Sequence, residues 1–256
     1  MIPAESPAPV LHAEAPDGVL IAYRVHGDDA EPGRPPVLLV HGFASDSTVT
    51  WEGTGWVRAL VDSGRRVVTV DLRGHGDSDK PVEPDAYAPD RLGADLVAVL
   101  DSAGAARCDA VGYSMGNRVI SALCEVAPGR VRRVVVGGAG PTELFATWEL
   151  DEVRAYLVDD VPPTNPVIAQ VLGPALRAGA DREALLAVVG GVSGAPLAIP
   201  GGVPVLFVAG EQDPVPVGVQ QLALDWGSDL VTIPGRDHVS TLTSRTFKDA
   251  AIDFLL

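Results

Sequence analysis

Short, nearly continuous runs of apolar residues recur along most of the chain. Many of their residues are β-branched, and few polar residues interrupt them. Such runs are typical of strands that helices cover on both faces. Strands with one solvent-exposed face instead alternate between apolar and polar residues. The sequence therefore predicts a sheet with a buried interior. Its strands are expected at 19–25, 37–40, 67–70, 110–112, 131–136, 203–208 and 230–233.

The stretches between these runs have helical spacing. In 90–103 the apolar residues recur three and four positions apart, and Gly104 follows as a stop for the helix. A second helix is expected over 115–127 for the same reason. A strand followed by a helix, repeated along the chain, predicts an α/β fold with a mostly parallel sheet flanked by helices.

This alternation breaks once, between residues 140 and 202, where prolines are frequent and no run resembles a strand. About 60 residues in short helices bury little surface on their own. We therefore expect a core domain formed by 1–139 and 203–256, with 140–202 inserted as a helical cap over the rim of the sheet. The cap helices are expected at 143–158, from Asn165-Pro166 onward, where a cap residue precedes proline, and at 181–189.

Composition and charge exclude several classes of protein. Apolar residues make up 46% of the chain and charged residues 21%, and the formal net charge is −15. So much negative charge disfavours nucleic acid or an anionic membrane as a partner. Met1–Val10 lacks the features of a signal peptide, and no apolar run is long enough to span a bilayer, so we expect a cytoplasmic protein. Cys108 and Cys124 fit no metal motif and are expected to be small buried residues.

The pentapeptide Gly112-Tyr113-Ser114-Met115-Gly116 lies between a predicted strand and a predicted helix. Ligands of open parallel sheets bind beyond the carboxyl ends of the strands. A strand that turns directly into a helix strains the middle residue, and glycines on either side let the two elements pass. Ser114 would then project at a helix N-terminus, which favours developing negative charge. The motif alone also fits an ordinary turn, so the other residues decide.

A serine nucleophile needs a base, and the base needs an acid to orient it. In this topology the chain order is serine, acid, histidine. His238 is the only histidine after Ser114. Asp213, in the loop after the next-to-last predicted strand, is the preferred acid. Glu211 is expected to serve the turn, and Asp237 is too close along the chain to fold back onto the imidazole.

The reaction also needs two hydrogen-bond donors for an oxyanion. One is expected to be the backbone N–H of Met115, directly after the nucleophile. The other is expected to be the N–H of Phe43, in the loop after 37–40, where Gly42 allows a close backbone approach. His41 is expected to hydrogen-bond within that loop.

In these motifs the chain resembles the α/β-hydrolase superfamily, in particular its serine esterase and lactonase-like branch. The resemblance implies the α/β-hydrolase fold. Serine at position 114 disfavours haloalkane dehalogenase and epoxide hydrolase chemistry, which need a carboxylate nucleophile. The segments that carry the resemblance are the oxyanion loop 37–43, the D-x-R-G-x-G-x-S turn 71–78, the elbow 112–116, the acid loop 210–213 and the histidine loop 237–238.

The expected reaction is hydrolysis of a carboxylic ester of a small or medium apolar substrate through an acyl-enzyme on Ser114. Trp148, Phe145 and Tyr156 either line the substrate pocket or pack the cap on the core. Lactone, thioester and carbon–carbon bond cleavage by the same triad are open alternatives, and so are a ligand receptor and a lyase. We expect a small-molecule partner, a monomer or homodimer, and no metal or cofactor.

Overall fold

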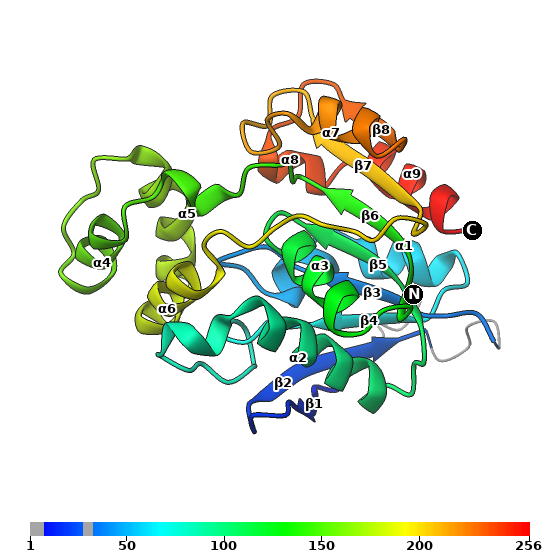
Figure 1. Cartoon of the computed structure of the whole chain (residues 1–256), viewed down its shortest axis with the longest axis horizontal. Coiled ribbons are helices and arrows are strands. Elements are labelled where there is room, and N and C mark those ends of the chain that lie inside the picture. The colour runs from blue at the N-terminus through cyan, green and yellow to red at the C-terminus, as the bar shows by residue number, and fades with distance from the viewer. Residues whose placement is uncertain (1–7, 28–32) are drawn as a thin grey trace, which may run out of the picture.

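The computed structural model describes residues 8–27 and 33–256, and these form an eight-stranded sheet (Figure 1). The strand order is β1-β2-β4-β3-β5-β6-β7-β8. All neighbours from β4 to β8 pair in parallel, whereas β1 and β2 are antiparallel. This confirms the predicted fold class. The strands are β1 Leu11–Glu14, β2 Leu20–His26, β3 Val37–Val40, β4 Val67–Val70, β5 Cys108–Tyr113, β6 Val131–Gly137, β7 Val205–Gly210 and β8 Asp229–Ile233.

The inner strands are buried along their whole length, as their continuous apolar runs predict. No residue of β3, β4, β5 or β7 is exposed. The edge strand β1 was not predicted, because only one of its four residues is buried and no apolar run marks it. Cys108, on β5, and Cys124 are buried free thiols.

Helices cover both faces of the sheet. On one face α2 (Pro89–Ser102) packs against α3 (Gly116–Val126), and both lie in front of the sheet in Figure 1. On the other face α1 (Trp56–Asp62) and α9 (Arg245–Leu255) share a second apolar core. Shorter elements fill the loops: η1 (Thr48–Glu52), η2 (Pro84–Tyr87), α7 (Val219–Asp225) and α8 (His238–Leu242).

The inserted residues form a lobe of short helices at one side of the sheet, on the left of Figure 1. The lobe contains η3 (Leu144–Thr147), α4 (Leu150–Val158), α5 (Pro166–Arg177) and α6 (Arg182–Val192). The predicted helix at 143–158 is broken, since Trp148 has an extended backbone and its ring packs on Phe145, with centroids 5.2 Å apart. The predicted start of α5 is confirmed: Asn165 Oδ1 accepts a hydrogen bond from Val167 N at 3.1 Å.

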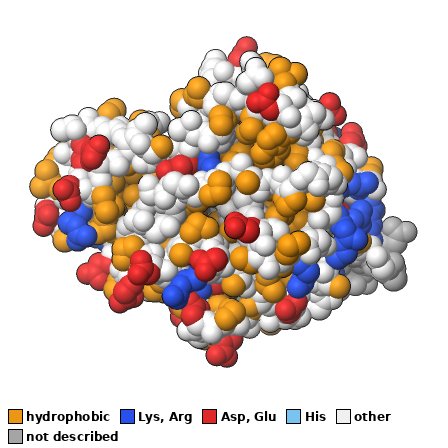
Figure 2. Space-filling view, in the orientation of Figure 1, with side chains coloured by type: hydrophobic (Ala, Val, Ile, Leu, Met, Phe, Trp, Pro, Cys, Tyr) orange, Lys and Arg blue, Asp and Glu red, His pale blue; other side chains and the backbone are white. Residues whose placement is uncertain are grey.

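None of the described helices is both long and apolar enough to cross a bilayer. The segment Met1–Val10, for which the sequence predicts no signal peptide, lies mostly outside the described residues. Figure 2 shows a notch in the surface between the helical lobe and the upper part of the molecule, where Figure 1 labels α7 and β8.

Candidate active site

Ser114 occupies a sharp turn between β5 and α3. Its φ is +52°, a left-handed conformation that non-glycine residues adopt at a cost of about 1–3 kcal/mol. A Cβ atom on Gly116 would lie 2.3 Å from Val40 O, so only glycine lets α3 begin against the end of β3. A Cβ atom on Gly112 would lie 2.4 Å from Asn117 Oδ1. The steric reason predicted for both glycines of the pentapeptide is confirmed.

His238 and Asp213 come together beyond the ends of β8 and β7. His238 Nδ1 lies 2.8 and 3.0 Å from the two carboxylate oxygens of Asp213. The Asp213 side chain is fully buried, whereas 27% of the His238 side chain is exposed. A buried carboxylate on Nδ1 selects the tautomer that leaves Nε2 free to accept a proton.

The two competing acids are occupied elsewhere. Glu211 Oε2 accepts a hydrogen bond from Gly235 N at 2.8 Å, within the turn after β8. Asp237 caps α8 by accepting from Ser240 N at 2.7 Å, and the Ser240 hydrogen bonds lower the pKa of its carboxyl. The structure therefore places only Asp213, of these three acids, against the imidazole.

Tyr113 contacts His238, and the sequence did not predict this contact. Its hydroxyl donates a hydrogen bond to the backbone carbonyl of His238, and the two rings lie 5.1 Å apart. The His238 ring also lies beside Gly138, which lines the same pocket as Ser114. Within the described part of the chain, no hydrogen bond joins Ser114 Oγ to His238.

The two expected oxyanion donors have free backbone N–H groups. Neither Phe43 N nor Met115 N donates a hydrogen bond to any described residue. Gly42 faces Ser114 so closely that a Cβ atom on this glycine would lie 3.1 Å from Ser114 Cβ. The loop after β3 thus passes directly beside the serine.

His41 sets the orientation of the peptide that carries Phe43 N–H. Its Nδ1 donates to Gly42 O at 2.7 Å, while Nε2 accepts from Leu72 N at 3.0 Å, so the ring is neutral. Burial lowers its pKa, which favours the same state. In a trans peptide C=O and N–H point in opposite directions. The bond to Gly42 O therefore turns Phe43 N–H away from His41.

His75 holds the next residue of this loop. Its Nε2 accepts a hydrogen bond from Ala44 N at 3.1 Å, and Nδ1 donates to Arg73 O at 3.1 Å. Ala44 has a φ of +56°, so the loop is strained where His75 binds it. Burial and the neighbouring His41 lower the pKa of His75 to about 3. The sequence predicted that His41 holds the loop in shape, but it did not predict that His75 does so too.

Residues of the 71–78 turn form structural hydrogen bonds. Arg73 pairs with the buried Asp95 at 2.6 Å and with Asp17 at 2.9 Å. Asp77 binds Arg24 at 2.6 Å. These contacts fasten the turn to β2 and α2 and leave it outside the reacting groups.

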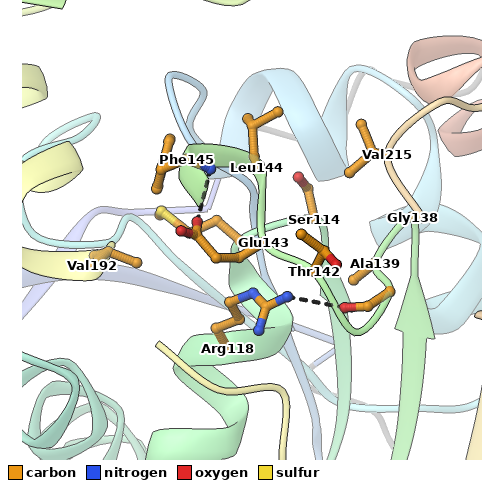
Figure 3. A pocket seen from close by; sticks show the side chains of 12 residues that line it. Ser114, Arg118, Gly138, Ala139, Thr142, Glu143, Leu144, Phe145, Val192 and Val215 are labelled. Atoms are coloured by element: carbon orange, nitrogen blue, oxygen red, sulfur yellow. Dashed lines mark hydrogen bonds between the residues drawn. The ribbon is translucent and has the colours of Figure 1, made fainter. Parts of the chain in front are cut away.

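A narrow pocket opens at Ser114 (Figure 3). Phe145 and Leu144 line it, together with Val192 and Val215. Trp148 and Tyr156, the other expected pocket residues, are not in its lining. Trp148 is buried against the rings of Phe43 and Phe145, and Tyr156 packs against the apolar core. Arg118, which the sequence did not single out, is the one basic residue of the lining.

The family described as alpha/beta hydrolase fold matches residues 35–166, just over half of the chain. The chain belongs to the alpha/beta hydrolase fold family. The matched part contains the oxyanion loop with Phe43 and the elbow with Ser114.

Curated relatives match only part of this chain. Epoxide hydrolase A of Mycobacterium tuberculosis (strain ATCC 25618 / H37Rv) is 42% identical over 90 residues, 35% of this chain and 27% of that protein. The sn-1-specific diacylglycerol lipase ABHD11 of Mus musculus is 35% identical over 114 residues, 44% of this chain and 35% of that protein. The matched part of the chain thus spans about a third of the length of these relatives.

Solved structures match nearly the whole chain. A hydrolase from Pseudomonas aeruginosa PA01 superposes with a TM-score of 0.74 at 25% identity, covering 96% of this chain and 98% of that one. The enol-lactonase from Burkholderia xenovorans LB400 has a TM-score of 0.73 at 24% identity, covering 96% and 99%. At 24% identity, the similarity to the enol-lactonase shows a shared fold and nothing finer.

Proposed function

We propose that the chain is a serine hydrolase that cleaves a carboxylic ester through an acyl-enzyme on Ser114. One observation carries the proposal: the buried Asp213 carboxylate holds Nδ1 of His238, whose ring lies beside the pocket of a strained Ser114. A nucleophile, a base oriented by an acid, and two free N–H donors are the parts that acyl transfer requires.

In the first half of the reaction, Ser114 Oγ attacks the ester carbonyl and transfers its proton to His238 Nε2. Rotation about the Ser114 side chain brings Oγ to the imidazole when substrate fills the pocket, since catalytic hydrogen bonds often tighten only in the complex. The N–H groups of Phe43 and Met115 stabilise the tetrahedral oxyanion. The protonated His238 then gives the proton to the departing alcohol.

In the second half, His238 accepts a proton from water, and the hydroxide attacks the acyl carbon. Collapse of the second tetrahedral intermediate releases the carboxylic acid and returns the proton to Ser114. Asp213 keeps its negative charge throughout and stabilises the imidazolium.

The nucleophile separates this reaction from that of the relatives named epoxide hydrolases. A carboxylate that opens an epoxide forms an ester, which water can cleave. Ser114 would form an ether, which an imidazole and water do not hydrolyse. Ester cleavage therefore suits the residue at this elbow.

A fluorophosphonate probe tests the nucleophile. We expect stoichiometric labelling at Ser114, located by peptide mass spectrometry, and its loss in Ser114→Ala. Folded protein that stays unlabelled would contradict the proposal. Ser121→Ala, which removes a hydroxyl of α3 that bonds to Asn117 O, is the matched control and should label normally.

Activity against a panel of p-nitrophenyl esters, lactones, thioesters and a substrate with a cleavable carbon–carbon bond then identifies the bond that is cleaved. We expect kcat/KM to be highest for esters with short acyl chains, because the pocket at Ser114 is narrow. If kcat/KM were higher for the carbon–carbon bond substrate and the probe still labelled Ser114, the proposed ester hydrolysis would be wrong. The assignment of Ser114 as the nucleophile would stand.

A further inference from the structure

Arg118 lies four residues after Ser114, in the first turn of α3. Figure 3 shows its side chain reaching from α3 into the pocket of the nucleophile. The residue is only 6% exposed. Nη1 donates to Ala195 O at 2.7 Å and Nη2 to Gly140 O at 2.9 Å. The guanidinium is therefore fixed in place by two uncharged acceptors, and its other N–H groups bind no described residue.

The charge of Arg118 is not paired in the way that other buried arginines are. Arg65 lies 2.5 Å from Asp109 and Arg73 lies 2.6 Å from Asp95. No carboxylate of the described chain lies within ion-pair distance of Arg118. Since a buried charge that no carboxylate contacts directly is costly, packing alone would be served better by leucine or methionine.

Glu143 is the acid whose field acts on Arg118, and it also lines the pocket. Its two oxygens accept hydrogen bonds from Phe145 N at 2.8 Å and Gly194 N at 3.1 Å. The carboxylate is thus held by the backbone at the base of the cap and not by the guanidinium. It leaves the N–H groups of Arg118 available and limits the negative charge that the pocket accepts.

We propose that Arg118 binds a carboxylate of the substrate, so that the preferred ester is a half-ester of a short dicarboxylic acid. This inference rests on the proposed function, because the same pocket holds Ser114. Ser114 and Arg118 line the same narrow pocket, so a carboxylate bound at Arg118 would lie a few carbon atoms from the scissile carbonyl. The fixed planar fork of a guanidinium matches the shape of a carboxylate. A dianionic phosphate suits the site less, because Glu143 would repel it more strongly.

A steric role for Arg118 is the competing explanation. Arg118 also lines a second groove, bordered by Ser121, Ile199 and Pro200. Its side chain thus forms a wall between the groove and the pocket at Ser114. A wall needs bulk and no charge, so it does not account for a buried guanidinium.

The test compares two esters of similar size that differ in charge. The substrates are mono-p-nitrophenyl glutarate and p-nitrophenyl pentanoate, at 0.15 M salt, where distant charges are largely screened. We expect the wild-type protein to have a kcat/KM at least about tenfold higher for the glutarate half-ester. In Arg118→Gln this ratio should fall by about 10- to 100-fold, the range for a lost charge-assisted hydrogen bond.

Two further variants sharpen the result. Glu143→Gln removes the nearby negative charge and should raise the ratio by about 2- to 5-fold. Arg130→Gln is the matched control, because Arg130 also donates to a backbone carbonyl, Ala105 O at 2.9 Å, away from the pocket. Its ratio should equal that of the wild type.

Equal kcat/KM values for the two esters in the wild type would overturn the inference. So would an Arg118→Gln variant that keeps the ratio and gains activity on longer neutral esters, the result that a wall predicts. Labelling of Ser114 by the fluorophosphonate separates the two proposals. A labelled protein without preference for the half-ester refutes only the carboxylate site, whereas an unlabelled folded protein refutes the serine mechanism.

Discussion

The two sides of the candidate site are built in different ways. On the core side, loops after four parallel strands carry Phe43, Ser114, Asp213 and His238, and buried polar groups hold them in place. On the cap side, short helices present apolar residues, and several large ones are exposed, among them Leu150, Val158 and Val161. The candidate catalytic residues therefore depend on hydrogen bonds anchored in the sheet, while the pocket walls from the cap depend on short helices, of which α6 packs against η2. Substitutions should separate the two sides by their effects on rate and on stability.

The largest effect is expected for the acid of the core side. Asp213→Asn should lower kcat by about 10⁴-fold with little change in KM, because the amide no longer selects the correct tautomer of His238. Steady-state kinetics on a p-nitrophenyl ester measures it. Glu211→Gln, in the same loop, should keep nearly full activity. A rate for Asp213→Asn within tenfold of the wild type would place the acid elsewhere.

Next in size is the effect of the residue that orients the oxyanion peptide. His41→Gln should lower kcat by about 10²-fold, the cost of one lost oxyanion donor. The fluorophosphonate should also react more slowly, since its phosphoryl oxygen uses the same N–H groups. His12→Gln, on the exposed edge strand β1, serves as the control. An unchanged labelling rate in His41→Gln would show that Phe43 N–H needs no such support.

A smaller effect is expected on the folding stability of the core side at acidic pH. The unfolded His75 binds a proton below about pH 6.5, whereas in the folded protein the pKa is about 3. Stability from this group is therefore present above pH 6.5 and is lost as the pH falls toward 3. It accounts for about 2 kcal/mol of the loss between pH 7 and pH 5.

Urea unfolding of the wild type and of His75→Gln at these two pH values measures this contribution as a difference. Asp17, whose pKa Arg73 lowers to about 2, acts in the same direction in both proteins and cancels. Equal losses of stability in the two proteins would mean that His75 is protonated in the folded state.

The smallest effect is expected in the cap. Asn165→Ala removes the N-cap of α5 and should cost about 1 kcal/mol of local stability. Amide exchange over 166–177 should quicken, while kcat for a neutral ester should change little. Asn165→Asp, which can still cap the helix, should behave like the wild type. A large fall in kcat for Asn165→Ala would show that the cap and the core are coupled.

The core strands and the elbow were predictable because burial on both faces and the strand–helix turn leave local patterns in the sequence. Topology then pointed to Asp213 and His238. The edge strand β1 and the break at Trp148 leave no such pattern, since tertiary packing decides them. Tyr113 and Arg118 were not predicted for a related reason: their contacts join segments far apart in the chain.

The backbone carbonyls of Gly140 and Ala195, at the two ends of the cap helices, both accept hydrogen bonds from Arg118. The two ends of this segment therefore lie close together, at one side chain. Closing a loop of twice the length costs only about 0.6 kcal/mol more. Residues 141–194 are therefore a candidate cassette for exchange in protein engineering: another helical segment that packs against η2, as α6 does, could be grafted between the same two carbonyls to change the substrate range.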